Sequence, residues 1–186
     1  VSLRPGSLVL YKIHPAIVGA VTEKIEIRLA DGKTKRVRDK DVLLLHPGPL
    51  DSLASLDAGQ AAIDEAWELL EGETVPLADL ADLLFGEFSP ATAWGAWQVL
   101  QDGLYFEGDL SEIRRRSAEA VQEERAARES KHRVAEEWEA FLSRVGKAEL
   151  AEDDRKRLAE VERVALGTSA RSRILSSFDL PETAEA

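Results

Sequence analysis

The hydrophobic pattern of this chain changes its period near residue 57, and that change limits the folds it can adopt. Before that point, Lys24–Leu29 alternates polar and apolar residues one by one, which is typical of a half-buried β-strand. Asp31-Gly32 favours a tight hairpin turn, because glycine adopts positive φ without steric cost, and Lys33–Arg38 is then the returning strand. Three more β-rich stretches lie at residues 7–13, 16–22 and 42–45. We therefore expect a small SH3-like β-barrel over residues 1–50.

Beyond residue 57 the apolar residues recur at helical spacing. Ile63, Trp67 and Leu70 fall at i, i+4 and i+7, which predicts one helix. Thr74 is the expected N-cap of a second helix, and Ser89-Pro90 is the expected start of a third, which ends at Gly103. A hairpin is expected over residues 104–114. Three short helices followed by a hairpin predict a winged helix-turn-helix over residues 51–116.

The rest of the chain is expected to be helical. From Ser117 to about Val145 there is no glycine or proline, and the composition is rich in strong helix formers. Further helices are expected over residues 152–166 and 170–178, and another is expected to begin at Pro181. We therefore expect residues 117–186 to be a helical linker, in a chain of the α+β class. Because this last helix would begin where the sequence ends, and because the sequence starts at Val1 and has no methionine, we expect it to be the N-terminal part of a longer polypeptide.

The charges are segregated along the sequence. The 186 residues carry 24 Lys and Arg against 35 Asp and Glu, a formal net charge of −11. Residues 1–50 contribute +4 and residues 111–186 contribute −2, whereas residues 51–110 carry thirteen acids and no base. Neutralisation of phosphates supplies most of the non-specific affinity of proteins for nucleic acids. Any contact with nucleic acid is therefore expected from the flanking segments.

Two basic clusters are the candidate contacts with nucleic acid. The first follows the predicted strand pair: Arg28, Lys33, Lys35, Arg36, Arg38 and Lys40. Clustered Lys and Arg on one module favour phosphate binding, although an ordinary solvated strand face has the same composition. The second cluster, Arg114-Arg115-Arg116, either touches nucleic acid or is the solvated start of the long helix.

The predicted recognition helix, Pro90–Gln101, has a composition that disfavours DNA reading. It offers Thr92, Gln98 and Gln101 but no positive charge, and Glu87 and Asp102 flank it. We therefore interpret the winged helix as a packing scaffold or a contact for a protein partner.

The composition also excludes several kinds of chemistry. Without cysteine there is no disulfide, thiolate zinc site or thiol nucleophile, which fits a reducing cytoplasm. The three histidines are far apart, and the known phosphate-loop, serine-hydrolase and zinc-protease motifs do not occur. Asp153-Asp154 is interpreted as helix capping. No apolar run approaches the ~18 residues of a membrane span. We expect no catalytic residue, no metal ligand and no membrane contact.

The order of these parts resembles the N-terminal region of the ribonuclease II and ribonuclease R family, in its bacterial, cyanobacterial and chloroplast form. The resemblance lies in three stretches: the opening Leu3–Tyr11 with the basic hairpin Asp31–Arg38, the pattern from Phe88 to Trp97 followed by Gly103–Gly108, and the tail Ser176–Glu182. In that subgroup a helix-turn-helix replaces cold-shock domains.

The resemblance implies a magnesium-dependent exoribonuclease that hydrolyses single-stranded RNA in the 3′→5′ direction to nucleoside monophosphates. In the family, closely spaced aspartates of the catalytic domain hold the magnesium. No such cluster occurs here, so this chain would be the RNA-guiding region and bind no magnesium itself. The alternatives are an acidic winged-helix adaptor that binds a protein partner and, less favoured, a DNA-binding regulator.

Overall fold

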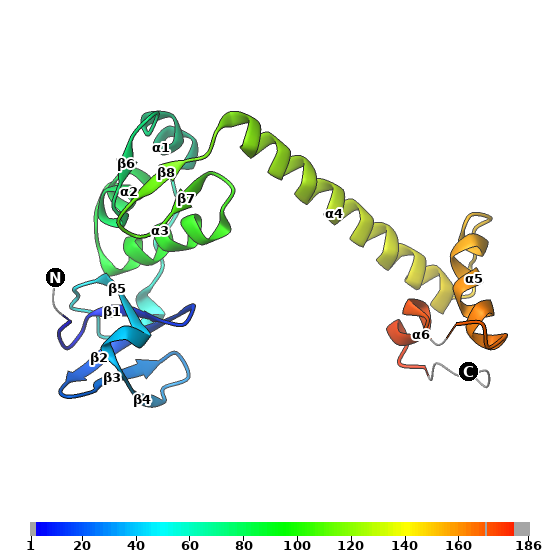
Figure 1. Ribbon diagram of the computed structural model, residues 1–186, viewed down its shortest axis with the longest axis horizontal. Helices are drawn as coiled ribbons and strands as arrows, with labels where there is room; N and C mark the ends of the chain where they lie inside the picture. Colours follow the sequence, from blue (N-terminus) through cyan, green and yellow to red (C-terminus); the bar gives the residue numbers. More distant parts are fainter. Residues whose placement is uncertain (1–2, 170, 181–186) are drawn as a thin grey trace. The chain divides into compact units, whose positions relative to one another are not determined.

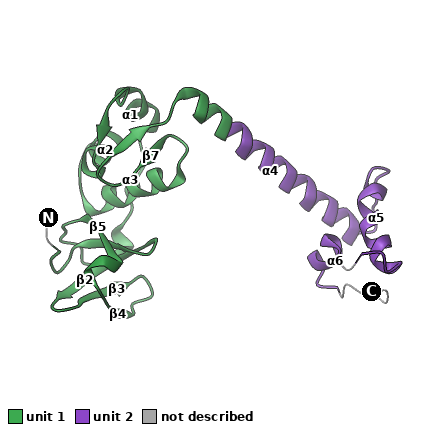
Figure 2. Ribbon diagram, viewed as in Figure 1, with its two compact units in different colours: residues 1–124 green, residues 125–186 purple. Residues whose placement is uncertain are grey.

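The computed structural model describes residues 3–169 and 171–180, which form two compact units over residues 1–124 and 125–186 (Figure 2). The first unit contains two antiparallel sheets and three α-helices, and the second is helical. The α+β class predicted from the sequence is confirmed. Pro181 and the residues after it lie outside the described part of the chain, and these include the last two residues of the tail pattern.

The N-terminal sheet has five antiparallel strands (Figure 1). They are β1 (Leu8–Tyr11), β2 (His14–Val21), β3 (Ile25–Leu29), β4 (Thr34–Val37) and β5 (Val42–His46). Their order is β4-β3-β2-β1-β5, and a short 3-10 turn, η1 (Asp39–Asp41), joins β4 to β5. The predicted Asp31-Gly32 turn is present, with Gly32 at φ 78°.

The sheet bends around an apolar core of its own. Its register shifts between Val18 and Ala20, a bulge that increases the local twist. The core residues alternate along the strands: Val9, Ala16, Val18, Ile25, Ile27 and Val37. β4 and β5 are the two edges and do not pair with each other in the described sheet. The predicted barrel therefore takes the form of an open, bent sheet, and its SH3-like character stays a prediction.

Residues 63–115 have the elements of a winged helix. The helices are α1 (Ile63–Leu69), α2 (Leu77–Phe85) and α3 (Pro90–Asp102), and the strands β6 (Thr74–Val75), β7 (Phe106–Gly108) and β8 (Ile113–Arg115) pair in the order β6-β8-β7. Ser89 caps α3 through a capping box with Thr92, and Gly103 ends it at φ 68°. This is the predicted order of three helices and a hairpin.

Thr74 does not have its predicted role. It was expected to cap the second helix, but it pairs with Arg114 as part of strand β6. Pro76 is the residue that precedes α2, and a proline holds the residue before it in extended conformation. The same proline therefore favours both the strand and the start of the helix.

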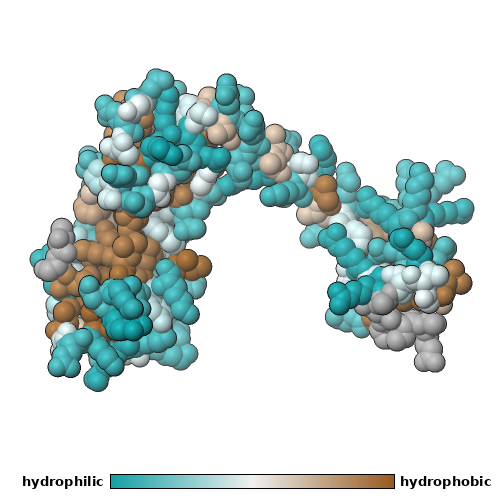
Figure 3. All heavy atoms as spheres, viewed as in Figure 1, coloured by the Kyte–Doolittle hydropathy of each residue, from teal (hydrophilic) through white to brown (hydrophobic). Residues whose placement is uncertain are grey.

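The sheet and the winged helix share one hydrophobic core. Leu8, Leu10 and Ile17 of the sheet belong to the same buried cluster as Trp97 and Phe106 of the winged helix. Figure 3 shows apolar side chains gathered where these two parts of the first unit meet. The domain boundaries expected at residues 50 and 116 stay predictions, since the structure joins both parts in one unit.

Gly95 allows α3 to pack closely against α2 and the segment before α1. A Cβ at this position would lie 2.6 Å from Cβ of Ala58 and 2.8 Å from Cζ of Phe85. Because real side chains do not approach so closely, any larger residue would push α3 away from its neighbours.

His46 is the last residue of β5 and is only 9% exposed. Its Nδ1 accepts a hydrogen bond from the Gly48 amide at 2.9 Å, and its ring lies 4.6 Å from that of Phe88. Burial lowers the pKa of His46; its hydrogen bond to the Phe88 backbone opposes the shift and the nearby Arg4 adds to it. The structure therefore favours the neutral imidazole.

We predict that this histidine makes the first unit less stable in mild acid. The unfolded chain takes up a proton near the ordinary histidine pKa of ~6.5, whereas the folded chain does so at lower pH. The stability contributed by neutral His46 is thus complete above pH ~6.5 and is lost as the pH falls below it. Urea unfolding at pH ~8 and pH ~5 should show a smaller decrease in His46→Gln than in the unchanged chain. The exposed His132 is the control, since His132→Gln should leave that decrease unaltered.

The second unit is held by contacts between three helices. α4 (Ala118–Gly146) crosses the boundary between the units, and α5 (Asp154–Ala165) and α6 (Arg173–Ser177) follow. Phe141 is fully buried, and the Arg173 guanidinium lies 4.2 Å from the Trp138 ring centre. The predicted apolar second half of the long helix therefore does pack against its neighbours.

Asp154 links α4 to α5. Its carboxylate accepts from Nη2 of Arg144 at 2.7 Å, from Nε at 2.9 Å and from the Ala151 amide at 2.9 Å. The hydrogen bonds from Arg144, followed by that from Ala151, lower the pKa of Asp154 to about 2. The capping role predicted for Asp153-Asp154 is replaced by this ion pair, since Asp153 makes no capping hydrogen bond.

We predict that Asp154→Asn lowers the melting temperature of the second unit by at least ~5 °C at neutral pH. The ion pair contributes in full above pH ~4 and is lost as the pH falls through about 2, because the depressed pKa means that the unfolded chain is protonated first. The difference between variant and unchanged chain in circular dichroism melts should therefore shrink as the pH falls through about 2 and vanish below it. An equal difference at both pH values would contradict this assignment.

Candidate nucleic-acid interface

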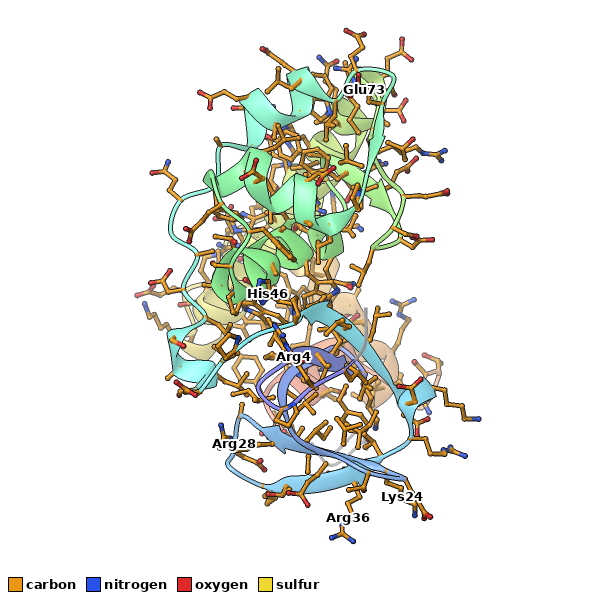
Figure 4. The ribbon with its side chains drawn as sticks, turned by 90° about the vertical axis from the view of Figure 1, so that its left-hand side faces the viewer. Arg4, Lys24, Arg28, Arg36, His46 and Glu73 are labelled. Carbon is orange, nitrogen blue, oxygen red and sulfur yellow. The ribbon has the colours of Figure 1, made fainter. Side chains whose placement is uncertain are left out.

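The two parts of the first unit differ in net charge, since cations predominate on the N-terminal sheet and carboxylates on the winged helix. Figure 4 shows Lys24, Arg28 and Arg36 on the N-terminal sheet and Glu73 at the opposite end, on the winged helix. This separation follows from the sequence, since residues 51–110 have no base. An anion approaching the first unit is attracted by the sheet and repelled by the winged helix.

Strands β3 and β4 place Arg28 and Arg36 on the face of the sheet that is directed away from its own core. Their register pairs Glu26 with Arg36 and Arg28 with Thr34. Nη2 of Arg28 donates to the Asp51 carbonyl at 2.6 Å, and Nε of Arg36 lies 3.8 Å from Oε2 of Glu26. A hollow of about 290 Å³ lies beside Arg28, lined also by Glu26, Thr34 and Asp51.

Two more members of the basic cluster form exposed ion pairs. Nζ of Lys33 lies 2.8 Å from Asp31, and Nε of Arg38 lies 3.1 Å from Asp41. The hydrogen bonds with Lys33 and Arg38 lower the pKa of Asp31 and of Asp41, respectively. Because exposed ion pairs contribute little to stability, these cations can exchange their carboxylate for a phosphate at low cost.

The remaining two members of the cluster are differently placed. Lys35 shares its side of β4 with Val37, and its Nζ lies 4.8 Å from the ring centre of Tyr11. Lys40 is exposed in η1. The structure therefore brings all six residues to one sheet and its η1 turn, on more than one of its faces. Their contact with RNA stays a prediction.

The second basic cluster, Arg114-Arg115-Arg116, lies in and just after strand β8 of the β7–β8 hairpin, the wing of the winged helix, and its side chains interact chiefly with the protein itself. Arg115 lies 2.6 Å from Glu71, its guanidinium lies 4.5 Å from the Trp67 ring centre, and its side chain is only 20% exposed. Nη1 of Arg116 donates to the Gly103 carbonyl at 2.6 Å. Arg114 is the exposed member, at 67%, and pairs with Glu107. Arg115 and Arg116 are therefore not the solvated helix start that the sequence left open: these contacts give them a structural role, and their contact with nucleic acid stays a prediction.

The predicted recognition helix is largely part of the core. Ala93, Gly95, Ala96 and Trp97 of α3 are buried, and Trp94 stacks on Trp97 with the ring centres 4.9 Å apart. This burial agrees with the interpretation of α3 as a packing helix.

Residues 3–169 and 171–180 contain no group of three His, Cys, Asp or Glu side chains that could hold a metal ion. Among the helices described for the chain, none has the length and apolar character needed to cross a membrane.

Comparison with known proteins gives two matches. Residues 121–186 match the family model of a double helix-turn-helix domain of ribonuclease II. An uncharacterized ribonuclease of Synechocystis sp. is 33% identical over 115 residues, an alignment that covers 57% of this chain and 17% of the relative. The chain thus spans only a small part of that relative. No solved structure matches this chain significantly.

These matches confirm the resemblance to the ribonuclease II family. The family model, however, places its double helix-turn-helix at residues 121–186, whereas the sequence resemblance associated a helix-turn-helix with residues 88–108. The family model covers most of α4 together with α5 and α6, the segment that the sequence predicted as a helical linker.

We predict different effects on stability for two neighbouring arginines of the wing. Arg115→Ala removes an ion pair and the packing on Trp67, and should destabilise the first unit by about 1–2 kcal/mol. Arg114→Ala should change its stability by less than ~0.5 kcal/mol, because that side chain is exposed. Urea unfolding followed by tryptophan fluorescence measures both, and equal effects would contradict the structural role of Arg115.

Proposed function

We propose that this chain is the RNA-contacting N-terminal region of an exoribonuclease that degrades single-stranded RNA in the 3′→5′ direction to nucleoside monophosphates. The observation that carries the proposal is the match of residues 121–186 to a ribonuclease II domain. The concentration of cations on the N-terminal sheet of the first unit supports it. A cytoplasmic location is part of the proposal.

The charge separation within the first unit supports a guiding role. Arg36 and Arg38 have exposed side chains, at 76% and 67%, and their carboxylate partners are themselves partly exposed. Phosphates can replace those partners without desolvating a buried charge. The acidic winged helix repels RNA, so that a strand bound at the sheet is kept away from residues 51–110.

The described residues do not fit the magnesium that catalysis in this family needs. No group of three His, Cys, Asp or Glu side chains among them could hold a metal ion, and in the adjacent pair Asp153-Asp154 the Asp154 carboxylate already accepts three hydrogen bonds from Arg144 and Ala151. We therefore derive no catalytic step for this chain. In the proposal, hydrolysis and its metal belong to a separate catalytic domain of the longer protein.

One observation favours the alternative of a protein-binding adaptor. Leu69 is 66% exposed beside a hollow of about 390 Å³, which Leu83, Val75 and the carboxylates of Glu73, Asp79 and Asp82 also line. An apolar groove with an acidic rim suits a basic partner helix. This groove is on the winged helix, so its use would not compete directly with RNA bound at the sheet.

Binding of a fluorescent oligouridylate between about 50 mM and 200 mM salt tests the proposal. We expect the affinity to fall steeply with salt, and the slope of log affinity against log salt to decrease by ~0.7 for each phosphate contact removed in Arg36→Gln and Arg38→Gln. Arg157→Gln is the matched control, an exposed arginine that forms an ion pair with Glu137 outside the two candidate clusters, and should bind like the unchanged chain.

Two outcomes would contradict RNA guiding by the sheet: no binding at the lowest salt, or binding that is equally reduced by Arg157→Gln. The variant Leu69→Glu separates the alternatives, because it disrupts the acidic groove and should leave RNA binding unaltered.

A further inference from the structure

The ring of Tyr11 is approached by two ammonium groups from different parts of the sheet. Tyr11 ends β1, and Lys12 follows it in the turn to β2. Nζ of Lys12 lies 5.9 Å from the ring centre and Nζ of Lys35, on β4, lies 4.8 Å from it. Both distances are within the ~6 Å range of cation–π attraction.

The bend of the sheet brings these residues together. Tyr11 pairs with His14 of β2 and Val42 of β5, so it is two strands away from β3 and three from β4 in the hydrogen-bonded order. Lys35 still reaches it, because the sheet curves around its core and Tyr11 packs at the margin of that core. Lys35 lies over this margin with its charged end at the surface, as long amphipathic side chains do.

Lys12 and Lys35 differ from neighbouring cations in having no carboxylate partner among the described residues. Lys33, Arg36 and Arg38 each have a carboxylate within 3.8 Å or less. In the part of the chain that the structure describes, no ion pair is found for Lys12 or Lys35. The two ammonium groups therefore leave positive charge beside the ring, which a bound phosphate would neutralise.

The turn itself does not require a lysine at position 12. Lys12 has φ 60°, the left-handed region that glycine and asparagine adopt at lower cost. A lysine nevertheless stands at this position, and its ammonium group lies beside the Tyr11 ring. The next residue, Ile13, is 61% exposed and adds apolar surface to the same turn.

We propose that Tyr11, Lys12 and Lys35 form a seat for one nucleotide of single-stranded RNA. The two ammonium groups bind the phosphodiester, and the Tyr11 ring stacks on the base once the phosphate has drawn Lys35 aside. Stacking on an aromatic side chain beside cations that follow the backbone is how single strands are held without sequence preference. This inference rests on the proposed function and adds Tyr11 and Lys12 to the expected contacts.

The test compares two probes of equal length, an oligouridylate and an oligomer of abasic ribose phosphates. Tyr11→Phe keeps the ring and should bind the oligouridylate like the unchanged chain. Tyr11→Leu should weaken oligouridylate binding about tenfold, as the loss of one stacked base does, and should not affect the abasic probe. Lys12→Gln with Lys35→Gln should lower the salt slope for both probes by ~1.4.

Lys24→Gln is the matched control for charge. Lys24 is exposed in the turn after the other end of β2, remote along the strand from the pairing of Tyr11 with His14. Removing its charge should reduce the salt slope by no more than ~0.7, the value for one phosphate contact. The difference in oligouridylate affinity between Tyr11→Phe and Tyr11→Leu should be the same with and without Lys24→Gln. Circular dichroism melts identify any variant that does not fold, and the lysine pair then tests the seat without altering the ring.

The outcomes separate this inference from the proposed function. If the unchanged chain binds oligouridylate with a steep salt slope but Tyr11→Leu binds equally well, the seat is wrong and the proposed function stands. If Tyr11→Leu weakens both probes alike, the ring has only a structural role. Competition by polyglutamate at the same charge concentration would indicate an acidic protein ligand and overturn the inference. No binding of either probe would overturn both.

Discussion

The apolar core shared by the N-terminal sheet and the winged helix is the interaction on which the first unit depends. Leu8, Leu10 and Ile17 belong to the same cluster as Trp97 and Phe106, so these side chains of the sheet are buried in a core that the winged helix shares, apart from the sheet's own core. This core fixes a basic sheet beside an acidic helical region and prevents the two from moving independently. A charge division present in the sequence thereby becomes a fixed electrostatic polarity, which can orient an approaching nucleic acid.

Most of the elements were predictable from the sequence because their signals are local. The alternation in Lys24–Leu29, the Asp31-Gly32 turn and the Ser89-Pro90 cap each specify structure within a few residues, and all three are present. The exceptions were non-local. Thr74 forms a strand because it pairs with Arg114, forty residues later, and the common core of sheet and helices required contacts that no periodicity reveals.

The candidate site was predictable in its location and less so in its members. Counting cations identified the sheet, but it could not show that Arg115 and Arg116 interact chiefly with Trp67, Glu71 and Gly103. It also missed Tyr11 and Lys12, since their association with Lys35 arises only when the sheet bends. The one local signal was an aromatic residue followed by lysine at a strand end, which is too common to carry an inference by itself.

The most direct test of the central claim is amide hydrogen exchange of the chain with and without oligouridylate, because it locates the contact without any substitution. The account predicts slower exchange in β1 to β5 and their turns, and unaltered exchange in residues 51–110. Slower exchange in α2 and α3 with none in the sheet would contradict it, since RNA would then bind where the first unit has no positive charge.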